Sequence, residues 1–208
     1  MRLTSMPKAS AMAQHTENTH FIVDAAKALL AEVGYGAMSM RQLASRAGIL
    51  PGSLYHHVTS KQDLLLLVVQ DVLQARETAW RQAPRKRSLL GELKTFIRFV
   101  LAWQVAQPDA AKVLEHEYRH LDAHLKHWLA QRTRDLPSRL QDLLRRGQQA
   151  RSLGDIDVES AALSIMALLG TADALRSSSP DWTASRLEAH FLQVSLRVLD
   201  VQKSSVPG

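Results

Sequence analysis

Residues 39–57 read SMRQLASRAGILPGSLYHH, and this stretch decides the fold. Its apolar residues recur at spacings of three and four, which predicts a short helix with one narrow apolar face, made by Met40, Leu43, Ala44 and Ala47. Ser39 is the expected N-cap of this helix. Gly48 can adopt the left-handed conformation that ends a helix, and Ile49 follows where an apolar contact would hold the turn. Pro51 fits the first position of a second helix.

The second helix is predicted over residues 51–58, about two turns, and only Leu54 and Val58 can share its inward face. A helix this short buries little apolar surface, so its exposed side is expected to have a function. Gly52 and Ser53 are small enough for the backbone to approach the wall of a DNA groove. Donors at phosphate reach would come from Tyr55, His56 and His57. The alternative is an ordinary helical corner with polar side chains in solvent.

Residues from about Ile22 to Leu66 resemble the DNA-binding region of the TetR family of bacterial transcriptional regulators. The likeness covers the first third of the chain. It rests on Ile22, Ala25, Ala26, Leu30, Gly34-Tyr35, Ser39-Met40-Arg41-Gln42-Leu43-Ala44, Ala47-Gly48-Ile49, Gly52-Ser53-Leu54-Tyr55-His56-His57 and Ser60-Lys61. The combined spacing is far more specific than a helix-turn-helix pattern alone.

The resemblance implies a role for each matching position. Ser39 and Arg41 would contact the sugar-phosphate backbone, while Gly52 and Ser53 would lie at base edges in the major groove. The residues expected to hold phosphates are Tyr55, His56, His57 and Lys61, the last beside the first amides of the following helix.

Two positions depart from the family pattern. Leu50 stands where a capping side chain is usual, so the second helix lacks an acceptor worth about 1 kcal/mol. Pro51 stands where many relatives have a basic residue. Contact with a thymine methyl group is therefore a further possibility for Leu50 or Pro51.

Composition agrees with a DNA-binding protein. The 208 residues are 46% apolar and 22% charged, as in ordinary globular proteins, and the formal net charge of +6 favours a polyanionic partner. Cysteine is absent, which excludes disulfides, thiolate zinc sites and cysteine nucleophiles. We find no apolar run of membrane-spanning length and no secretory signal, so we expect a cytoplasmic protein with no membrane partner.

The chain as a whole predicts an all-α protein of about nine helices, because proline and glycine separate helical patterns and no strand-like alternation is found. The first helix is expected over residues 17–33, with Phe21, Ala25, Ala28 and Leu29 in the core. Pro137 predicts a break near Leu136. The expected domains are a flexible tail (1–15), a three-helix helix-turn-helix domain (16–62), a bridging helix (63–83), a larger effector-binding and dimerisation bundle (84–202) and a second flexible tail (203–208).

The last two predicted helices carry broad apolar faces. One is formed by Ala161, Ala162, Ile165, Leu168, Leu169 and Ala172, and the other by Leu187, Phe191, Val194, Leu196, Val198 and Leu199. They predict a homodimer with a four-helix interface, and the alternative is a core within one chain. A dimer would place two recognition helices about one turn of DNA apart, on a palindromic operator of double-stranded DNA.

A concave apolar site for a small-molecule effector is predicted within the larger bundle. Its candidates combine aromatic or flexible side chains with polar tips: Trp103, Gln104, Tyr118, His124, His127, Trp128 and Met166. Ordinary core packing is the alternative for each. The resemblance implies a repressor that its effector releases from DNA.

A metal-responsive regulator is the main rival hypothesis. His116, His120 and His124 are spaced by four, so an unbroken helix would align them near His127. A helix junction at Asp122-Ala123 would remove this alignment, and we expect no metal or other cofactor. A helical-bundle enzyme or carrier is less favoured because the second Glu-x-x-His of a di-iron site is missing and catalytic motifs are absent.

Overall fold

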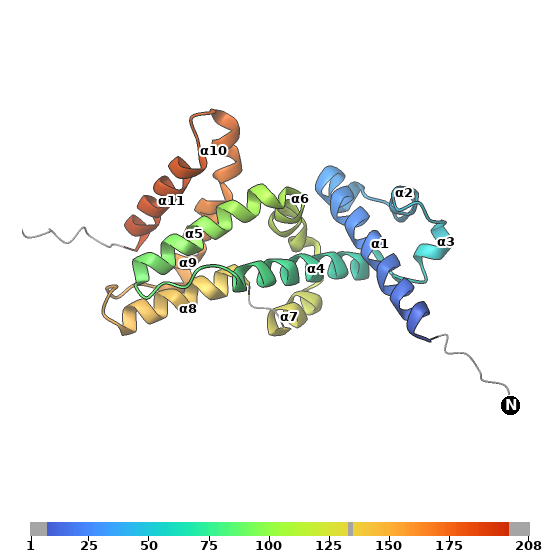
Figure 1. Cartoon of the computed structure of the whole chain (residues 1–208), viewed down its shortest axis with the longest axis horizontal. Coiled ribbons are helices and arrows are strands. Elements are labelled where there is room, and N and C mark those ends of the chain that lie inside the picture. Colours follow the sequence, from blue (N-terminus) through green and yellow to red (C-terminus); the bar gives the residue numbers. More distant parts are fainter. Residues whose placement is uncertain (1–7, 133–134, 200–208) are drawn as a thin grey trace, which may run out of the picture. The chain divides into compact units, whose positions relative to one another are not determined.

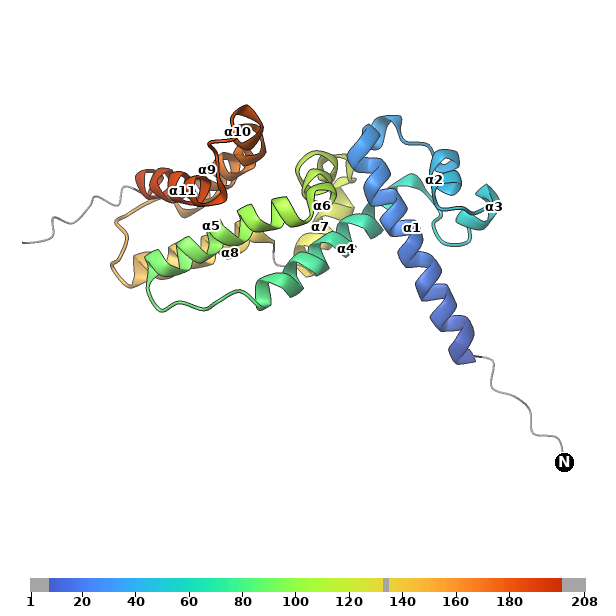
Figure 2. The same ribbon diagram turned by 45° about the horizontal axis from the view of Figure 1, so that its top comes forward.

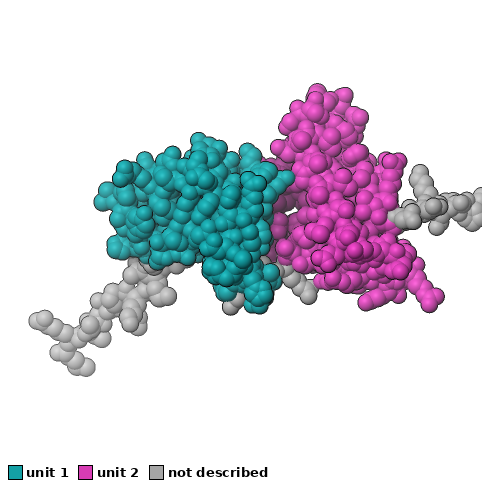
Figure 3. All heavy atoms as spheres, turned by 180° about the vertical axis from the view of Figure 1, so that it is seen from behind, with its two compact units in different colours: residues 1–74, 109–131 teal, residues 75–108, 132–208 magenta. Residues whose placement is uncertain are grey.

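The structure is a computed structural model that describes residues 8–132 and 135–199. Helices and turns account for this part of the chain, which contains no strand (Figure 1), so the predicted all-α class is confirmed. The chain forms two compact units, shown in different colours in Figure 3. Unit 1 comprises residues 1–74 and 109–131, and unit 2 comprises residues 75–108 and 132–208.

Unit 1 joins the N-terminal helices to a segment from the middle of the chain. The N-terminal elements are α1 (Lys8–Ala37), α2 (Met40–Arg46), α3 (Pro51–Leu54) and the first part of α4 (Lys61–Arg81). The later segment contains most of α6 (Pro108–Lys112), the π-helical turn η1 (Val113–Glu117), the 3-10 turn η2 (Tyr118–His120) and α7 (Ala123–Arg132). The turn η1 packs against α1.

The first helix differs from the prediction at both ends. It begins at Lys8, inside the predicted tail, and it passes through Gly34 to Ala37 with a break at Gly34, where φ is 76° and ψ is 163°. Only a residue without a Cβ adopts this backbone conformation readily. The predicted core face was also misplaced, because Phe21 is 70% exposed. The buried face is formed by Ile22, Val23, Ala26, Leu29 and Leu30.

Unit 2 is a helical bundle around one apolar core. Its helices besides the end of α4 are α5 (Leu89–Ala106), α8 (Leu136–Gln149), α9 (Val158–Gly170), α10 (Ala172–Ser178) and α11 (Ala184–Val198). In both ribbon views α5 lies along α8, and α11 packs on α5 and α9 (Figures 1 and 2). The predicted break near Leu136 is confirmed, since Asp135 caps α8 by accepting a 3.0 Å hydrogen bond from the Ser138 amide.

Most residues of the two predicted dimer faces lie in this core. The buried ones are Ala161, Ala162, Ile165, Leu169, Ala172, Leu187, Phe191 and Leu199, and Leu168, Leu196 and Val198 pack against them. The assignment of the buried residues to a dimer interface was therefore wrong. Leu168, Val194, Leu196 and Val198 are half-buried, and a dimer interface that includes them stays a prediction. Periodicity identified apolar faces correctly, but a core within the chain uses them.

One helical stretch was overlooked as a possible membrane span. Val158–Ser178 has 21 residues, a mean hydropathy of 1.4 and 28% of its most apolar window buried, so by length and composition alone it could cross a membrane. A single such stretch is weak evidence. The structure divides it at Thr171, which ends α9 and donates its hydroxyl hydrogen to the Leu168 carbonyl at 2.7 Å.

The compact units do not follow the predicted domain boundaries. Residues 109–131 were assigned to the larger bundle (84–202), yet they pack in unit 1, and α4 contributes to both units. The functional division into domains remains a prediction.

Candidate nucleic-acid interface

The start of α2 is fixed by a capping box. The Ser39 hydroxyl accepts a hydrogen bond from the Gln42 amide at 3.2 Å, and the Gln42 side chain accepts one from the Ser39 amide at 2.8 Å. Two amides that the helix itself leaves without partners are thereby satisfied. Ser39 is the predicted N-cap, and the prediction is confirmed.

The turn between α2 and α3 is a Schellman motif. Gly48 adopts a φ of 67°, its amide donates to the Ser45 carbonyl at 3.2 Å, and the Ile49 amide donates to the Ala44 carbonyl at 3.0 Å. This hydrogen-bond pattern stops α2 and sets the direction in which the chain leaves it. Because Leu43 and Ala44 are fully buried, the turn is anchored to the core of unit 1.

The next helix, α3, is shorter than predicted. It ends at Leu54, and residues 55–57 continue as a turn to Val58. Leu54 and Val58 are both buried, as predicted, and Leu50 provides no side-chain cap. The helix begins at Pro51 as predicted, so only its C-terminal end differs from the prediction.

The predicted DNA-contacting residues surround the outer side of α3. Ser39, Arg41, Leu50, Pro51, Gly52, Tyr55 and His56 are exposed, while Ser53, His57 and Lys61 are half-buried. The exposed fraction is 78% for Leu50 and 54% for Tyr55. Apart from its chain neighbours and the backbone of its own helix, no atom of the described residues lies within 4 Å of the position that a Cβ on Gly52 would occupy. The backbone of α3 is therefore open to a ligand surface.

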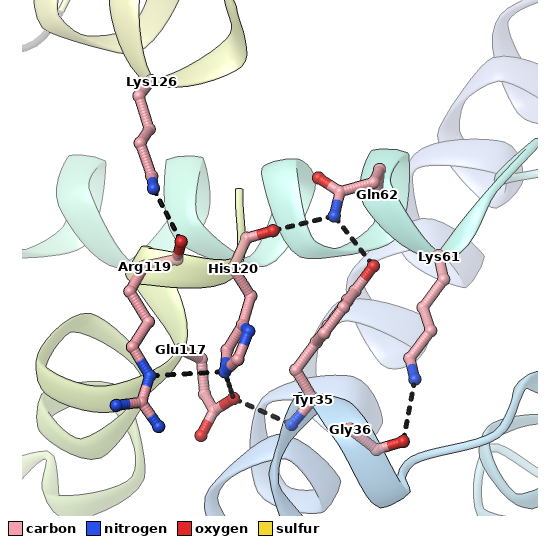
Figure 4. A network of polar contacts seen from close by, with 8 residues as sticks. All are labelled: Tyr35, Gly36, Lys61, Gln62, Glu117, Arg119, His120 and Lys126. Atoms are coloured by element: carbon pink, nitrogen blue, oxygen red, sulfur yellow. Dashed lines mark hydrogen bonds and ion pairs between the residues drawn. The ribbon is translucent and has the colours of Figure 1, made fainter. Parts of the chain in front are cut away.

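Residues at the end of α1 hold the Lys61 side chain in position. Its ammonium lies 4.4 Å from the centroid of the Tyr35 ring and 3.5 Å from the Gly36 carbonyl oxygen (Figure 4). Both contacts favour a positive charge at this point, at the first residue of α4. A cation is thus held beside α4's N-terminal amides, which also attract anions.

Gln62 joins three elements of unit 1 in the network shown in Figure 4. Its side-chain amide donates to the Tyr35 hydroxyl at 2.9 Å and to the His120 carbonyl at 2.8 Å. Its oxygen also accepts from the amide of Asp122, which the figure does not draw, at 3.2 Å. The rings of Tyr35 and His120 stack with centroids 5.3 Å apart. These contacts attach the ends of α1 and η2 to the beginning of α4.

Glu117 supplies a hydrogen-bond acceptor at the break in α1. Its buried carboxylate accepts a 2.8 Å hydrogen bond from the Tyr35 amide, and His120 Nε2 lies 3.9 Å from the same carboxylate oxygen. The conformation of Gly34 interrupts the α1 hydrogen-bond ladder at this amide, so an acceptor from another element is needed. Sequence reasoning gave no role in the DNA-binding unit to Glu117 or Gln62, because their partners are distant in sequence.

The predicted effector residues divide between the two units. Tyr118, His124, His127 and Trp128 belong to unit 1, and Trp103, Gln104 and Met166 belong to unit 2. In unit 2, the Gln104 side chain donates to the Leu169 carbonyl at 3.2 Å. The Trp103 indole Nε1 is buried and has no hydrogen-bond partner in the described part of the chain.

The histidine stripe proposed for a metal site is not formed. His116 lies in the π-helical turn, His120 in the 3-10 turn and His124 in α7, with an extended Leu121 between them. Among the described residues, no group of three or more histidine, cysteine, aspartate or glutamate side chains could hold a metal ion. The change of helix type breaks the four-residue spacing on which the hypothesis depended.

We expect Ser39→Ala to lower the free energy of unfolding by about 1 kcal/mol, because the Gln42 amide loses its acceptor. Urea titration of the full chain measures the change. Ser45→Ala, on the exposed side of the same helix, is the matched control. Equal urea midpoints for the two variants would show that the capping box adds no stability.

A helix–turn–helix with a capped first helix, a Schellman turn and a short exposed second helix defines a DNA-binding protein. Two family profiles match: bacterial regulatory proteins of the tetR family over residues 22–68, and the tetracyclin repressor-like C-terminal domain over residues 88–173. The chain belongs to the TetR family and is a DNA-binding transcriptional regulator.

Individual relatives and solved structures are also similar to this chain. The transcriptional repressor KstR2 of Rhodococcus jostii is 30% identical over 146 residues, 67% of this chain and 70% of that protein. A tetR-family regulatory protein from Rhodococcus has a TM-score of 0.75 at 23% identity, covering 88% of this chain and 96% of that one. AibR in complex with isovaleryl coenzyme A and operator DNA has a TM-score of 0.73 at 16% identity, covering 85% and 97%.

Proposed function

We propose that this protein is a repressor that binds a palindromic operator as a homodimer and is released by a small-molecule effector in the cytoplasm. The exposed α3, with Gly52 open and Tyr55 and His56 in solvent, carries the proposal. A single turn of helix that buries only Leu54 adds little stability by itself, which supports a role in recognition.

The roles of the DNA-contacting residues follow from their exposure. Gly52 and Ser53 approach base edges, and Leu50 or Pro51 can meet a thymine methyl group. The remaining six residues contact the sugar-phosphate backbone: Ser39, Arg41, Tyr55, His56, His57 and Lys61. Lys61 does so at the start of α4, beside the first amides of that helix.

Dimerisation through α9 and α11 is supported by the outer face of α9. Leu163 is 55% exposed, and Ser160, Ser164 and Ala167 lie beside it at helical spacing and are also exposed. An exposed leucine among small residues allows close approach of a second helix. This outer face replaces the buried residues that were first assigned to the interface.

The effector is proposed to bind within unit 2, near Trp103, Gln104 and Met166. The unpaired Trp103 Nε1 supports this, because a buried donor without an acceptor costs about 1–3 kcal/mol that a ligand oxygen would recover. AibR, whose structure holds isovaleryl coenzyme A, makes a coenzyme A thioester a reasonable effector class. The four predicted residues of unit 1 would then act in coupling to DNA rather than in ligand contact.

Selection of bound sequences from random DNA tests the function. We expect enrichment of an inverted repeat whose half-sites are about one helical turn apart. Binding to a scrambled version of the selected site is the control. Equal affinity and equal salt dependence for every sequence would contradict specific recognition.

Glu117→Ala is expected to destabilise unit 1 by about 1–3 kcal/mol, because the Tyr35 amide loses its acceptor at the break in α1. Glu117→Gln keeps an acceptor and should lose less. Glu115→Ala changes an exposed residue of the same turn and serves as the control. Chemical denaturation followed by circular dichroism measures all three; a loss no greater than that of the control would remove Glu117 from this role.

A further inference from the structure

Unit 2 contains a pocket of about 470 Å³ that none of the predicted site residues line. It is formed by the end of α4, the segment that leads into α5, and parts of α5 and α8. Its lining residues are Trp80, Pro84, Arg85, Lys86, Glu92, Thr95, Phe96, Arg139, Asp142, Leu143, Arg145, Arg146 and Gln149. Its volume lies in the range of about 300–1,000 Å³ that is typical of sites for organic ligands, well above the size of a single inorganic anion.

The lining of this pocket is strongly cationic. Five lysine or arginine side chains face two carboxylates, which leaves three positive charges in excess. Arg146 pairs with Glu92 at 2.7 Å and Arg145 with Asp142 at 3.2 Å, and each of these four side chains is at least partly exposed. Ion pairs of this kind are worth about 0–1 kcal/mol, so a phosphate can replace the carboxylates at little cost.

The remaining cations are held in place by packing. The guanidinium carbons of Arg85 and Arg139 lie 5.7 Å and 5.9 Å from the Trp80 ring centroid, and Trp80 itself packs edge-on against Phe96 at 5.8 Å. Lys86 passes over Gly91, where an added Cβ would lie only 3.0 Å from the Lys86 Cβ. A side chain at that position would push Lys86 away, so the glycine permits this close approach.

Further charged residues of both signs adjoin Arg139. Arg139 also pairs with Glu77, and Arg76 lies nearby. The pKa of Arg76 is lowered to about 10, chiefly by burial and also by the neighbouring Arg139, against the opposing effects of Asp135 and Glu77. An anionic ligand would offset this crowding of like charges.

We propose that the pocket binds the phosphate groups of a multiply phosphorylated, nucleotide-sized molecule. The lining has three excess positive charges, or two when Glu77, the partner of Arg139, is counted, which matches a ligand with two or three phosphates. The neutral part of the lining suits a base or a sugar. Trp80, Phe96 and Leu143 provide apolar surface there, and Thr95 and Gln149 provide hydrogen-bonding groups. Because it names a ligand class for the effector-binding unit, this inference rests on the proposed function.

Calorimetric titration of the full-length protein tests the inference. ATP, adenosine and inorganic phosphate are the probes, each at low and raised salt. We expect ATP to bind, adenosine to bind much more weakly and inorganic phosphate to bind at least tenfold more weakly than ATP, with ATP affinity falling as salt increases. The double variant Arg85→Ala/Lys86→Ala should reduce ATP affinity by about tenfold or more, since each lost contact is charge-assisted.

Arg87→Ala is the matched control, because Arg87 belongs to the same basic run but does not line the pocket. Undetectable ATP binding, equal affinity for inorganic phosphate, or an equal loss in the control would overturn the proposal. The proposal would also be overturned if the Arg85→Ala/Lys86→Ala variant kept its ATP affinity and lost affinity for DNA. Arg85 and Lys86 would then contact nucleic acid instead of a ligand in the pocket. Operator binding without ligand is measured separately, so failure of this site is distinguishable from failure of the repressor function.

Discussion

Gly52→Glu is expected to abolish specific operator binding while the fold is retained. A Cβ at this position would meet no other part of the described chain within 4 Å, beyond its neighbours in the same helix, so unit 1 should tolerate a side chain here. In the groove, however, it would occupy the space of a base edge and bring a negative charge toward phosphates. Like charges in contact cost several kcal/mol, which corresponds to a loss of operator affinity of about 100-fold or more. Fluorescence anisotropy with labelled operator DNA measures the loss.

Gly154→Glu is the control for this variant. It introduces the same charge at another exposed glycine with open surroundings, in unit 2. Operator affinity should change by less than about threefold in the control, apart from a small effect of net charge. A Gly52→Glu protein that binds the operator as tightly as the control would place recognition somewhere other than α3.

Leu163→Arg is expected to prevent formation of the proposed homodimer. The substitution leaves the core of unit 2 unchanged because Leu163 is exposed on the outer face of α9. In a dimer it would place a charge in each half of an apolar interface, at a cost of several kcal/mol for each desolvated charge. Operator affinity should then fall by at least about 100-fold, since a monomer reads only one half-site.

Analytical ultracentrifugation of the unliganded protein measures this change. Leu90→Arg is the matched control, because Leu90 on α5 is a leucine of nearly equal exposure, 52%, in the same unit. A dimer that persists in Leu163→Arg, or dissociation of both variants alike, would move the interface away from the outer face of α9.

The helix-turn-helix could be predicted from the sequence because its determinants are local. The cap at Ser39, the left-handed Gly48 and the helix start at Pro51 depend on interactions that span five residues or fewer, and the structure contains all three. The length of α3 was overestimated at its C-terminal end, where the spacing of Leu54 and Val58 fits a turn as well as a helix. The chemical class of the contacts on its outer side stays a prediction.

Contacts between residues that are distant in sequence could not be predicted, for a physical reason. Glu117 and Tyr35 are 82 residues apart, and nothing in either neighbourhood indicates that one supplies the acceptor for the other. The histidine spacing was misleading because periodicity assumes a regular α-helix, while η1 is π-helical and η2 is a 3-10 turn. Phe21 was predicted to be buried because the predicted apolar face of α1 is shifted by one residue from the face that the structure buries.

The apolar faces of α9 and α11 show a related ambiguity. Apolar periodicity indicates that one face of a helix is buried, but it does not indicate whether the same chain or a second copy covers that face. Ile165 and Phe191 satisfy the pattern and lie in the core of unit 2, whereas Leu163, outside the face that was assigned from the pattern, is exposed. Exposure in the structure, not periodicity, identified the surface that is available to a second subunit.

The carboxylate of Glu117 at the break in α1 also constrains how the protein matures during translation. The ribosome releases the first four helices before residues 109–131 emerge. Until that later segment arrives, the Tyr35 amide lacks its acceptor and the side of α1 that η1 covers is exposed. A gene fragment ending shortly after α4 would therefore encode a helix-turn-helix that remains prone to proteolysis, and grafting this unit onto another protein requires both stretches of the chain.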